Sequence, residues 1–189
     1  MMKKYFYCLI AVFCAGVFFT SCGDDNDNEI YIVDENWQAD NEQVIAEIAK
    51  NSDYKEIKSQ SNAGSIYYKV LEPKSPDIVP SNDTIYYSSK VKVYYFGVSM
   101  DETSRKMEYL FDSADYPYQS PRTFSVSGVV DGFATALQHM HPGDRWEIWI
   151  PWQLGYGSTG NHNSTTRQSS RPWAYSTLKF EVEVLEIVK

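Results

Sequence analysis

Residues 128–157 have the sequence GVVDGFATALQHMHPGDRWEIWIPWQLGYG, and this stretch decides the fold. Four apolar side chains in it recur at i, i+3, i+4 and i+7, the spacing that lines one face of a helix. They are Phe133, Ala136, Leu137 and Met140. Asp131 can cap this helix at its start. The turn at 141–143, His-Pro-Gly, ends it, because proline cannot donate to the helical ladder and glycine tolerates the turn.

A strand is predicted directly after this helix, over residues 145–151, RWEIWIP. Large apolar residues alternate there with a second set, so one face of the strand points to the core and the other mostly to solvent. The inward set is Trp146, Ile148 and Ile150, and the outward set is Arg145, Glu147 and Trp149.

Similar patterns predict the other elements. A helix over 36–50 places Trp37, Val44, Ile45 and Ile48 on one side. Strands are predicted over 65–71, 84–97, 107–112 and 177–189. The segments between them that are rich in proline or small polar residues are predicted as loops, over 72–83, 98–106 and 158–172. Several strands around a single short helix indicate an α+β domain with an antiparallel sheet.

Composition narrows the possible partners. The chain has 189 residues, of which 43% are hydrophobic, enough for the core of one domain. Its formal net charge of -8 argues against nucleic acid as a partner, because affinity for phosphates comes from clustered Lys and Arg. No metal site or cofactor is predicted, because His139, His141 and His162 lack the further ligands that zinc needs.

The first residues are typical of a secretory signal. Lys3 and Lys4 precede an apolar run over 5–19, which is shorter than the roughly 20 residues that span a membrane. The run ends in Thr-Ser before Cys22, which resembles the cleavage site of bacterial lipoproteins. This resemblance implies a signal peptide over 1–21, a lipid on Cys22 that anchors the protein to a membrane, and an acidic tether over 22–35. The expected location is the cell envelope, at the outer membrane, facing the periplasm or the cell surface.

The decisive stretch also resembles a known family. The shared motifs are Val129-Val130-x-Gly132-Phe133, Leu137-Gln138-x-Met140, Pro142-Gly143-Asp144-Arg145, Ile150-Pro151 and Leu154-Gly155-Tyr156-Gly157. They resemble the FKBP-type peptidyl-prolyl isomerases. The resemblance implies that residues 84–189 form a curved antiparallel sheet wrapped around one short helix. It says nothing of residues 36–83, which the patterns above predict to form a helix and strand extension.

The resemblance further implies a pocket for a substrate proline. It gives catalytic roles to Tyr95, Asp112 and Tyr156, with the tyrosine hydroxyl at 156 binding the substrate backbone. It gives substrate-binding roles to Phe111, Phe124, Val129, Val130, Phe133 and Phe180. In this scheme the backbone N–H of Val130 receives a substrate carbonyl, and Phe133 forms the floor.

The chain departs from the family pattern at three places. Phe133 stands where the family usually has tryptophan, and Arg122 stands where an aromatic residue is usual. Residues 171–175 replace the usual Ile-Pro-Pro, which puts the contact of that loop with substrate in doubt. The smaller floor is expected to leave a looser pocket that binds macrolide inhibitors more weakly and turns over more slowly.

The sequence therefore favours a peptidyl-prolyl isomerase that acts, by a non-covalent mechanism and without a cofactor, on X-Pro bonds of exported proteins. Two alternatives remain open: a non-catalytic module of the same fold that binds or chaperones extended chains, and a surface lipoprotein that binds glycans through exposed Trp149, Trp152 and Trp173. Each pocket phenylalanine, taken alone, is also compatible with a purely structural role in the core. The oligomeric state stays open, as does the role of the helix over 36–50, in docking or in dimerisation.

Overall fold

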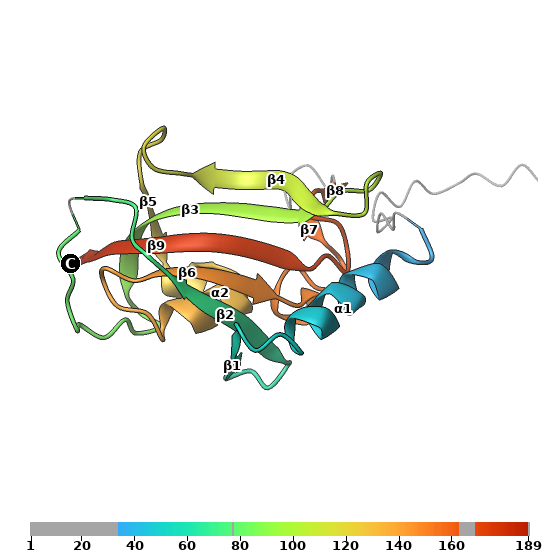
Figure 1. Cartoon of the computed structure of the whole chain (residues 1–189), viewed down its shortest axis with the longest axis horizontal. Helices are drawn as coiled ribbons and strands as arrows, with labels where there is room; N and C mark the ends of the chain where they lie inside the picture. Colours follow the sequence, from blue (N-terminus) through green and yellow to red (C-terminus); the bar gives the residue numbers. More distant parts are fainter. Residues whose placement is uncertain (1–33, 77, 163–168, 189) are drawn as a thin grey trace, which may run out of the picture.

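The computed structural model describes residues 34–76, 78–162 and 169–188. Within these ranges seven strands form one antiparallel sheet in the order β1-β2-β6-β9-β3-β4, and β5 pairs with the other end of β3 (Figure 1). The strands are β1 (Lys55–Lys58), β2 (Ser65–Leu71), β3 (Lys90–Met100), β4 (Met107–Ala114), β5 (Arg122–Ser125), β6 (Arg145–Ile150) and β9 (Leu178–Val188). Two short strands, β7 (Asn161–His162) and β8 (Ser169–Ser170), form a separate hairpin. The helices are α1 (Trp37–Ile48) and α2 (Asp131–Leu137), with 3-10 turns η1 (Val126–Gly128) and η2 (Trp152–Leu154).

The core lies between the sheet and α2, which crosses one face at β2 and β6 (Figure 1). β9 lies between β6 and β3, and its alternate residues Leu178, Phe180, Val182 and Val184 are buried as predicted. Gly132 lets the helix approach closely, because a side chain there would meet Ile150. The expected α+β class, with one short helix against an antiparallel sheet and a further helix near the N-terminus, is confirmed.

Several strand boundaries differ from the sequence patterns. The strand predicted over 84–97 begins only at Lys90 and continues to Met100, so the loop expected over 98–106 is shorter. β4 extends beyond the predicted 107–112 to Ala114. β1 and β5 were not predicted, because four residues are too few to show an alternation. Within 36–83, β2 pairs with β6, so this segment contributes strands to the same sheet.

The outward face of β6 is not open to solvent, as the alternation had suggested. Glu147 and Trp149 each retain only 8% of their surface. The Glu147 carboxylate accepts hydrogen bonds from the Trp149 indole, at 2.9 Å, and from the Tyr54 hydroxyl, and it lies 3.3 Å from the Lys179 ammonium group. The charge can be buried because three groups from three segments satisfy it, and no alternation within one strand reveals such an arrangement.

The short helix α2 also differs in detail. It ends at Leu137, so Met140 lies beyond it, although all four of the predicted apolar residues are buried. Val130 occupies the cap position, and Asp131 does not cap the helix. The carboxylate of Asp131 instead accepts hydrogen bonds from the hydroxyls of Ser59, at 2.8 Å, and Ser61, in the β1–β2 turn. The prediction that Asp131 caps the helix is therefore wrong.

α1 packs through the predicted face, where Trp37 and Asn41 make the deepest contacts. Its buried residues are Trp37 and Asn41, whereas Val44, Ile45 and Ile48 are only partly buried. Asn41 lies on this same face, one turn after Trp37, and its burial was not predicted because its side chain is polar.

The expected signal peptide over 1–21, Cys22 and most of the expected tether over 22–35 lie outside the described residues. No helix among the residues that the structure describes has the length and apolar character needed to cross a membrane.

Candidate functional site

A cavity of about 230 Å³ opens beside the start of α2. Its wall comes from β3, β4, β5, the turn before α2, the loop after η2 and β9. The lining residues are Tyr95, Phe111, Asp112, Phe124, Gly128, Val129, Val130, Phe133, Tyr156 and Phe180. All nine residues that the resemblance assigned to a pocket are thus brought to one place, and Gly128 is the member that the sequence reasoning missed. A glycine without a side chain leaves no pattern that would have revealed it.

Aromatic rings in edge-to-face contact build the cavity. Phe133, in the first turn of α2, is 3% exposed, and its ring centre lies 4.9 Å from that of Phe180. Phe111 stands edge-on to Phe180, at 5.5 Å, and to Tyr156, at 6.5 Å. Such contacts fix ring orientations, because each positive ring edge faces a negative ring face. The cavity is therefore preformed and lined mainly by apolar rings, and none of the described side chains fills it.

One edge of the cavity is polar. The Tyr95 hydroxyl donates to Asp112 Oδ2 at 2.6 Å. Nη1 of Arg122 donates to the Tyr95 oxygen and to Asp112 Oδ1, each at 2.8 Å. Burial, followed by the hydrogen bond to Asp112, raises the pKa of Tyr95 well above its ordinary value, so the phenol stays protonated near neutral pH. This group of three side chains holds the Asp112 carboxylate in place at the rim.

Two hydrogen-bonding groups at the cavity remain available. The N–H of Val130 and the hydroxyl of Tyr156 make no hydrogen bond to any residue in the described part of the chain. Burial and the nearby charge of Asp112 raise the pKa of Tyr156, so its hydroxyl is a donor near neutral pH. An extended peptide offers carbonyl oxygens to such donors. The cavity can therefore hold a compact apolar ring while its rim binds the flanking backbone.

The loop that carries Tyr156 is tied to the segment before β9. The Tyr175 N–H donates to the carbonyl of Gly157 at 2.9 Å, and the Gly160 N–H donates to the carbonyl of Tyr156 at 3.1 Å. Tyr175 also packs edge-on against Trp152, with ring centres 4.9 Å apart. The position of the Tyr156 hydroxyl thus depends on the segment around Tyr175.

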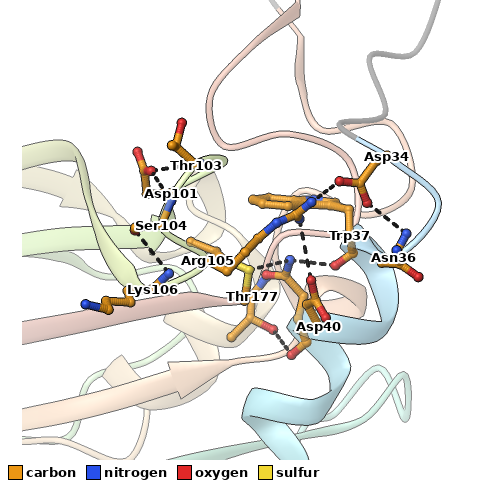
Figure 2. A network of polar contacts seen from close by, with 12 residues as sticks. Asp34, Asn36, Trp37, Asp40, Asp101, Thr103, Ser104, Arg105, Lys106 and Thr177 are labelled. Carbon is orange, nitrogen blue, oxygen red and sulfur yellow. Dashed lines mark hydrogen bonds and ion pairs between the residues drawn. The ribbon is translucent and has the colours of Figure 1, made fainter.

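That segment is in turn held by α1. The Trp37 indole donates to the Ala174 carbonyl at 2.9 Å, and the Arg105 guanidinium lies over the Trp37 ring, 5.2 Å from its centre. Arg105 also forms ion pairs with Asp34 and Asp40, at the start of α1 (Figure 2). The N-terminal helix therefore docks on the domain at the end that carries the Tyr156 loop.

Residues 171–175, which replace the family's Ile-Pro-Pro, do not line the cavity. Arg171 instead stacks 4.0 Å above the Tyr109 ring and pairs with Glu102 at 2.6 Å, and the Trp173 indole donates to Glu102 as well. The segment is thereby fixed to the β3–β4 turn. The expected pocket therefore lacks the wall that this segment would have formed. The segment instead supports the loop that carries Tyr156, through the hydrogen bond from Tyr175 to Gly157.

The three tryptophans proposed for glycan binding are not exposed. Trp149 is buried, and Trp152 and Trp173 are partly buried. Each indole N–H donates to a glutamate, in Trp152 to Glu42 at 3.0 Å. The premise of three exposed rings is therefore wrong.

A second, larger groove of about 700 Å³ lies elsewhere on the sheet, between the loop before β3 and the end of β9. Its walls mix Tyr94 and Tyr116 with the exposed Lys92–Glu186 ion pair. It shares no residue with the aromatic cavity. Among the described residues, no group of three or more His, Cys, Asp or Glu side chains is placed to hold a metal ion.

Comparison with known proteins agrees with this geometry. The family model of the FKBP-type peptidyl-prolyl cis-trans isomerases matches residues 81–185. The chain is 38% identical to the FKBP-type 22 kDa peptidyl-prolyl cis-trans isomerase of Escherichia coli over 101 residues, which are 53% of this chain and 42% of that protein. It is 40% identical to the outer membrane protein MIP of Legionella longbeachae over 49% of this chain and 34% of that one.

Among solved structures, FkpA from Escherichia coli superposes with a TM-score of 0.60 at 25% identity, over 80% of this chain and 59% of that chain. An isomerase from Pseudomonas syringae gives a TM-score of 0.59 at 20% identity, which shows likeness of fold over 85% of this chain and 99% of that chain. The chain spans less than half the length of the two curated relatives above.

Proposed function

Because this chain belongs to the family of FKBP-type peptidyl-prolyl cis-trans isomerases, we propose that it catalyses rotation about X-Pro bonds of peptide segments bound in the aromatic cavity. The observation that carries the proposal is the joint presence of a preformed hollow and two available donors, at Val130 and Tyr156. A volume of about 230 Å³ suits a proline ring with part of its flanking chain, since a cavity of about 150 Å³ holds benzene.

The reaction needs neither a nucleophile nor a proton transfer. Resonance holds the X-Pro bond planar with a barrier of about 18–20 kcal/mol, whereas the two planar states differ by only about 0.5–1 kcal/mol. Catalysis requires contacts that are better for the twisted bond than for either planar form. Each gain of about 1.4 kcal/mol in that preference speeds rotation about tenfold.

Each part of the cavity has a role in this scheme. The rings of Phe133, Phe111 and Phe180 hold the proline and exclude water from its amide, which weakens the resonance that keeps the bond planar. The N–H of Val130 and the hydroxyl of Tyr156 hold the chain on either side of the rotating bond. The carboxylate of Asp112 closes one side of the cavity at the rim.

A proline-isomerisation assay on short peptides tests the proposal. Tyr156→Phe and Asp112→Ala are expected to lower kcat/KM by about tenfold or more, because each removes a polar contact that favours the twisted bond. Tyr118→Phe is the matched control, since this tyrosine is 88% exposed and does not line the cavity. Peptide binding without any rate enhancement in the unaltered protein would instead support a non-catalytic binding module.

We also propose that the protein acts in the cell envelope on exported proteins, held to a membrane by a lipid on Cys22. The sequence of residues 1–22 and the name of the Legionella longbeachae relative, an outer membrane protein, support this location. Metabolic labelling with a radioactive fatty acid tests it. Label should enter the unaltered protein and be absent from Cys22→Ala, and label retained in that variant would contradict the anchor.

A further inference from the structure

Arg122 has a free edge beside the cavity. It begins β5, and its side chain is 51% exposed. Every hydrogen bond that it makes to described residues uses Nη1, which serves Tyr95 and Asp112. A guanidinium carries five N–H donors, so the edge formed by Nε and Nη2 remains available. That edge has the geometry that binds a carboxylate through two parallel hydrogen bonds.

The free edge is within reach of a bound peptide. Nη1 lies 2.8 Å from the hydroxyl of Tyr95 and from the carboxylate of Asp112, and both of these residues line the cavity. Consecutive Cα atoms in a chain are about 3.8 Å apart, so a residue next to a proline in the cavity passes close to this rim.

The local charges suit this contact. Asp112 is already compensated by Nη1 of Arg122 and by the Tyr95 hydroxyl, so the opposite edge of the guanidinium faces outward with its positive charge only partly neutralised. The net charge of the chain, -8, opposes acidic peptides at long range, but salt screens such repulsion beyond about 8–10 Å. At the cavity rim the arginine is therefore the nearest charge that an incoming side chain meets besides the paired Asp112.

We propose that Arg122 is a specificity-determining residue that makes the site prefer X-Pro segments with a carboxylate, glutamate or aspartate, next to the proline. This inference rests on the proposed function for its kinetic form, and on the geometry of the rim for its binding form. If Arg122 had a purely structural role, it would only hold Asp112 in place, and its substitution would affect all peptides alike.

The test compares two peptides that differ only in charge, with Glu or the isosteric Gln before the proline, and a second pair with the exchange after it. In the purified full-length protein, kcat/KM is expected to be about three- to tenfold higher for Glu than for Gln in one of the pairs. This ratio should fall to about one in Arg122→Met, which keeps most of the aliphatic stem, and lie between in Arg122→Lys, which keeps the charge without the two-pronged edge.

Substituting Arg122 also loosens Asp112 and can lower kcat/KM for every peptide. The ratio of kcat/KM for Glu and Gln peptides within one variant is unaffected by such a general loss. Lys92→Met is the matched control, because this cation lies on β3, beside β5, but pairs with Glu186 away from the cavity. Its ratio should equal that of the unaltered protein. A Glu-to-Gln ratio of one in both peptide pairs, or a ratio that Arg122→Met leaves unchanged, overturns the proposal.

Binding of the same peptides, measured by titration calorimetry, separates the two hypotheses. If no peptide is isomerised, the proposed catalytic function fails, and the preference for Glu is still decided by the ratio of the dissociation constants. Raising the salt concentration should reduce that ratio, because the contact is exposed and ionic. Tight binding that shows neither preference nor salt dependence counts against the role of Arg122 while leaving isomerisation intact.

Discussion

Asn41 holds Thr177 by two hydrogen bonds, with its side-chain oxygen accepting the Thr177 N–H at 2.8 Å and its backbone carbonyl accepting the Thr177 hydroxyl at 2.9 Å. Both residues are fully buried, although 136 positions separate them in the chain. Thr177 directly precedes β9 and ends the segment that supports the Tyr156 loop (Figure 2 shows Thr177 beside α1). The bond between α1 and this segment makes the helix part of the folded domain.

Asn41→Ala should therefore destabilise the protein. The substitution leaves the buried Thr177 N–H without a partner, which costs about 1–3 kcal/mol in the free energy of unfolding. Urea titration followed by circular dichroism measures this loss. Gln43→Ala, on the exposed side of the same helix, should stay within about 0.5 kcal/mol. Equal effects of the two substitutions would contradict a docked α1.

Removing one hydroxyl at the cavity rim should slow isomerisation while the fold persists. Tyr95→Phe keeps the ring that packs 5.3 Å from Phe124, but takes a hydrogen bond from Asp112 and one from Arg122. We expect kcat/KM to fall about tenfold, because the rim carboxylate becomes mobile. Thermal unfolding run in parallel shows whether the variant is folded; an unaltered kcat/KM would remove Tyr95 from the proposed machinery.

A methyl group at Gly97 should disturb the cavity from behind. Gly97 lies on β3, opposite Asp112 on β4 and Phe180 on β9. A Cβ at this position would lie 2.8 Å from Phe111 Cζ and closer still to the Phe180 ring. Gly97→Ala must displace these rings, at a cost of about 1–3 kcal/mol in the free energy of unfolding. Gly128→Ala is the comparison, since its Cβ would meet only Ser125, at 3.7 Å. Its unfolding free energy should change by less than about 0.5 kcal/mol.

The buried carboxylate of Glu147 should give the protein an acid-sensitive component of stability. Burial acts to raise its pKa, but hydrogen bonds from Tyr54 and Trp149 and the charge of Lys179 outweigh it, so the pKa of Glu147 lies below its ordinary value of 4.5. A pKa that is lower in the folded state adds stability above the unfolded value, and this stability is lost as pH falls through the folded value.

The stability difference between the unaltered protein and Glu147→Gln should therefore be larger at about pH 7 than at about pH 3. Denaturant titration at both pH values measures it. Glu56→Gln, at an exposed position of β1, serves as the control for the loss of a surface carboxylate. A difference that grows toward acid would mean that the carboxylate is protonated in the native state.

Much of the fold was predictable where a single segment carries its own pattern. The alternation in β9 and the apolar spacing in α2 each placed the correct residues in the core. The patterns failed where burial depends on partners far away in the chain. Asn41 and Glu147 are polar, so periodicity assigned neither to the interior, and both are buried because distant groups complete their hydrogen bonds.

The candidate site followed from a resemblance rather than from periodicity. Phe111 and Phe133 lie on different elements, and neither shows by its own neighbours that the two rings border one cavity. Arg122 was visible only as a departure from the family pattern. Its contacts with Tyr95 and Asp112 depend on the register of β5 against β3, which four residues of sequence cannot fix.

β9 lies between β3 and β6 in the sheet but follows both of them along the chain. These two strands therefore have unpaired edges until residues 178–188 take their place between them, and Phe180 completes the cavity at the same step. Exposed strand edges invite pairing with other chains. A chain of this topology is thus most prone to aggregate before β9 is in place, and its aromatic cavity is complete only after that stage.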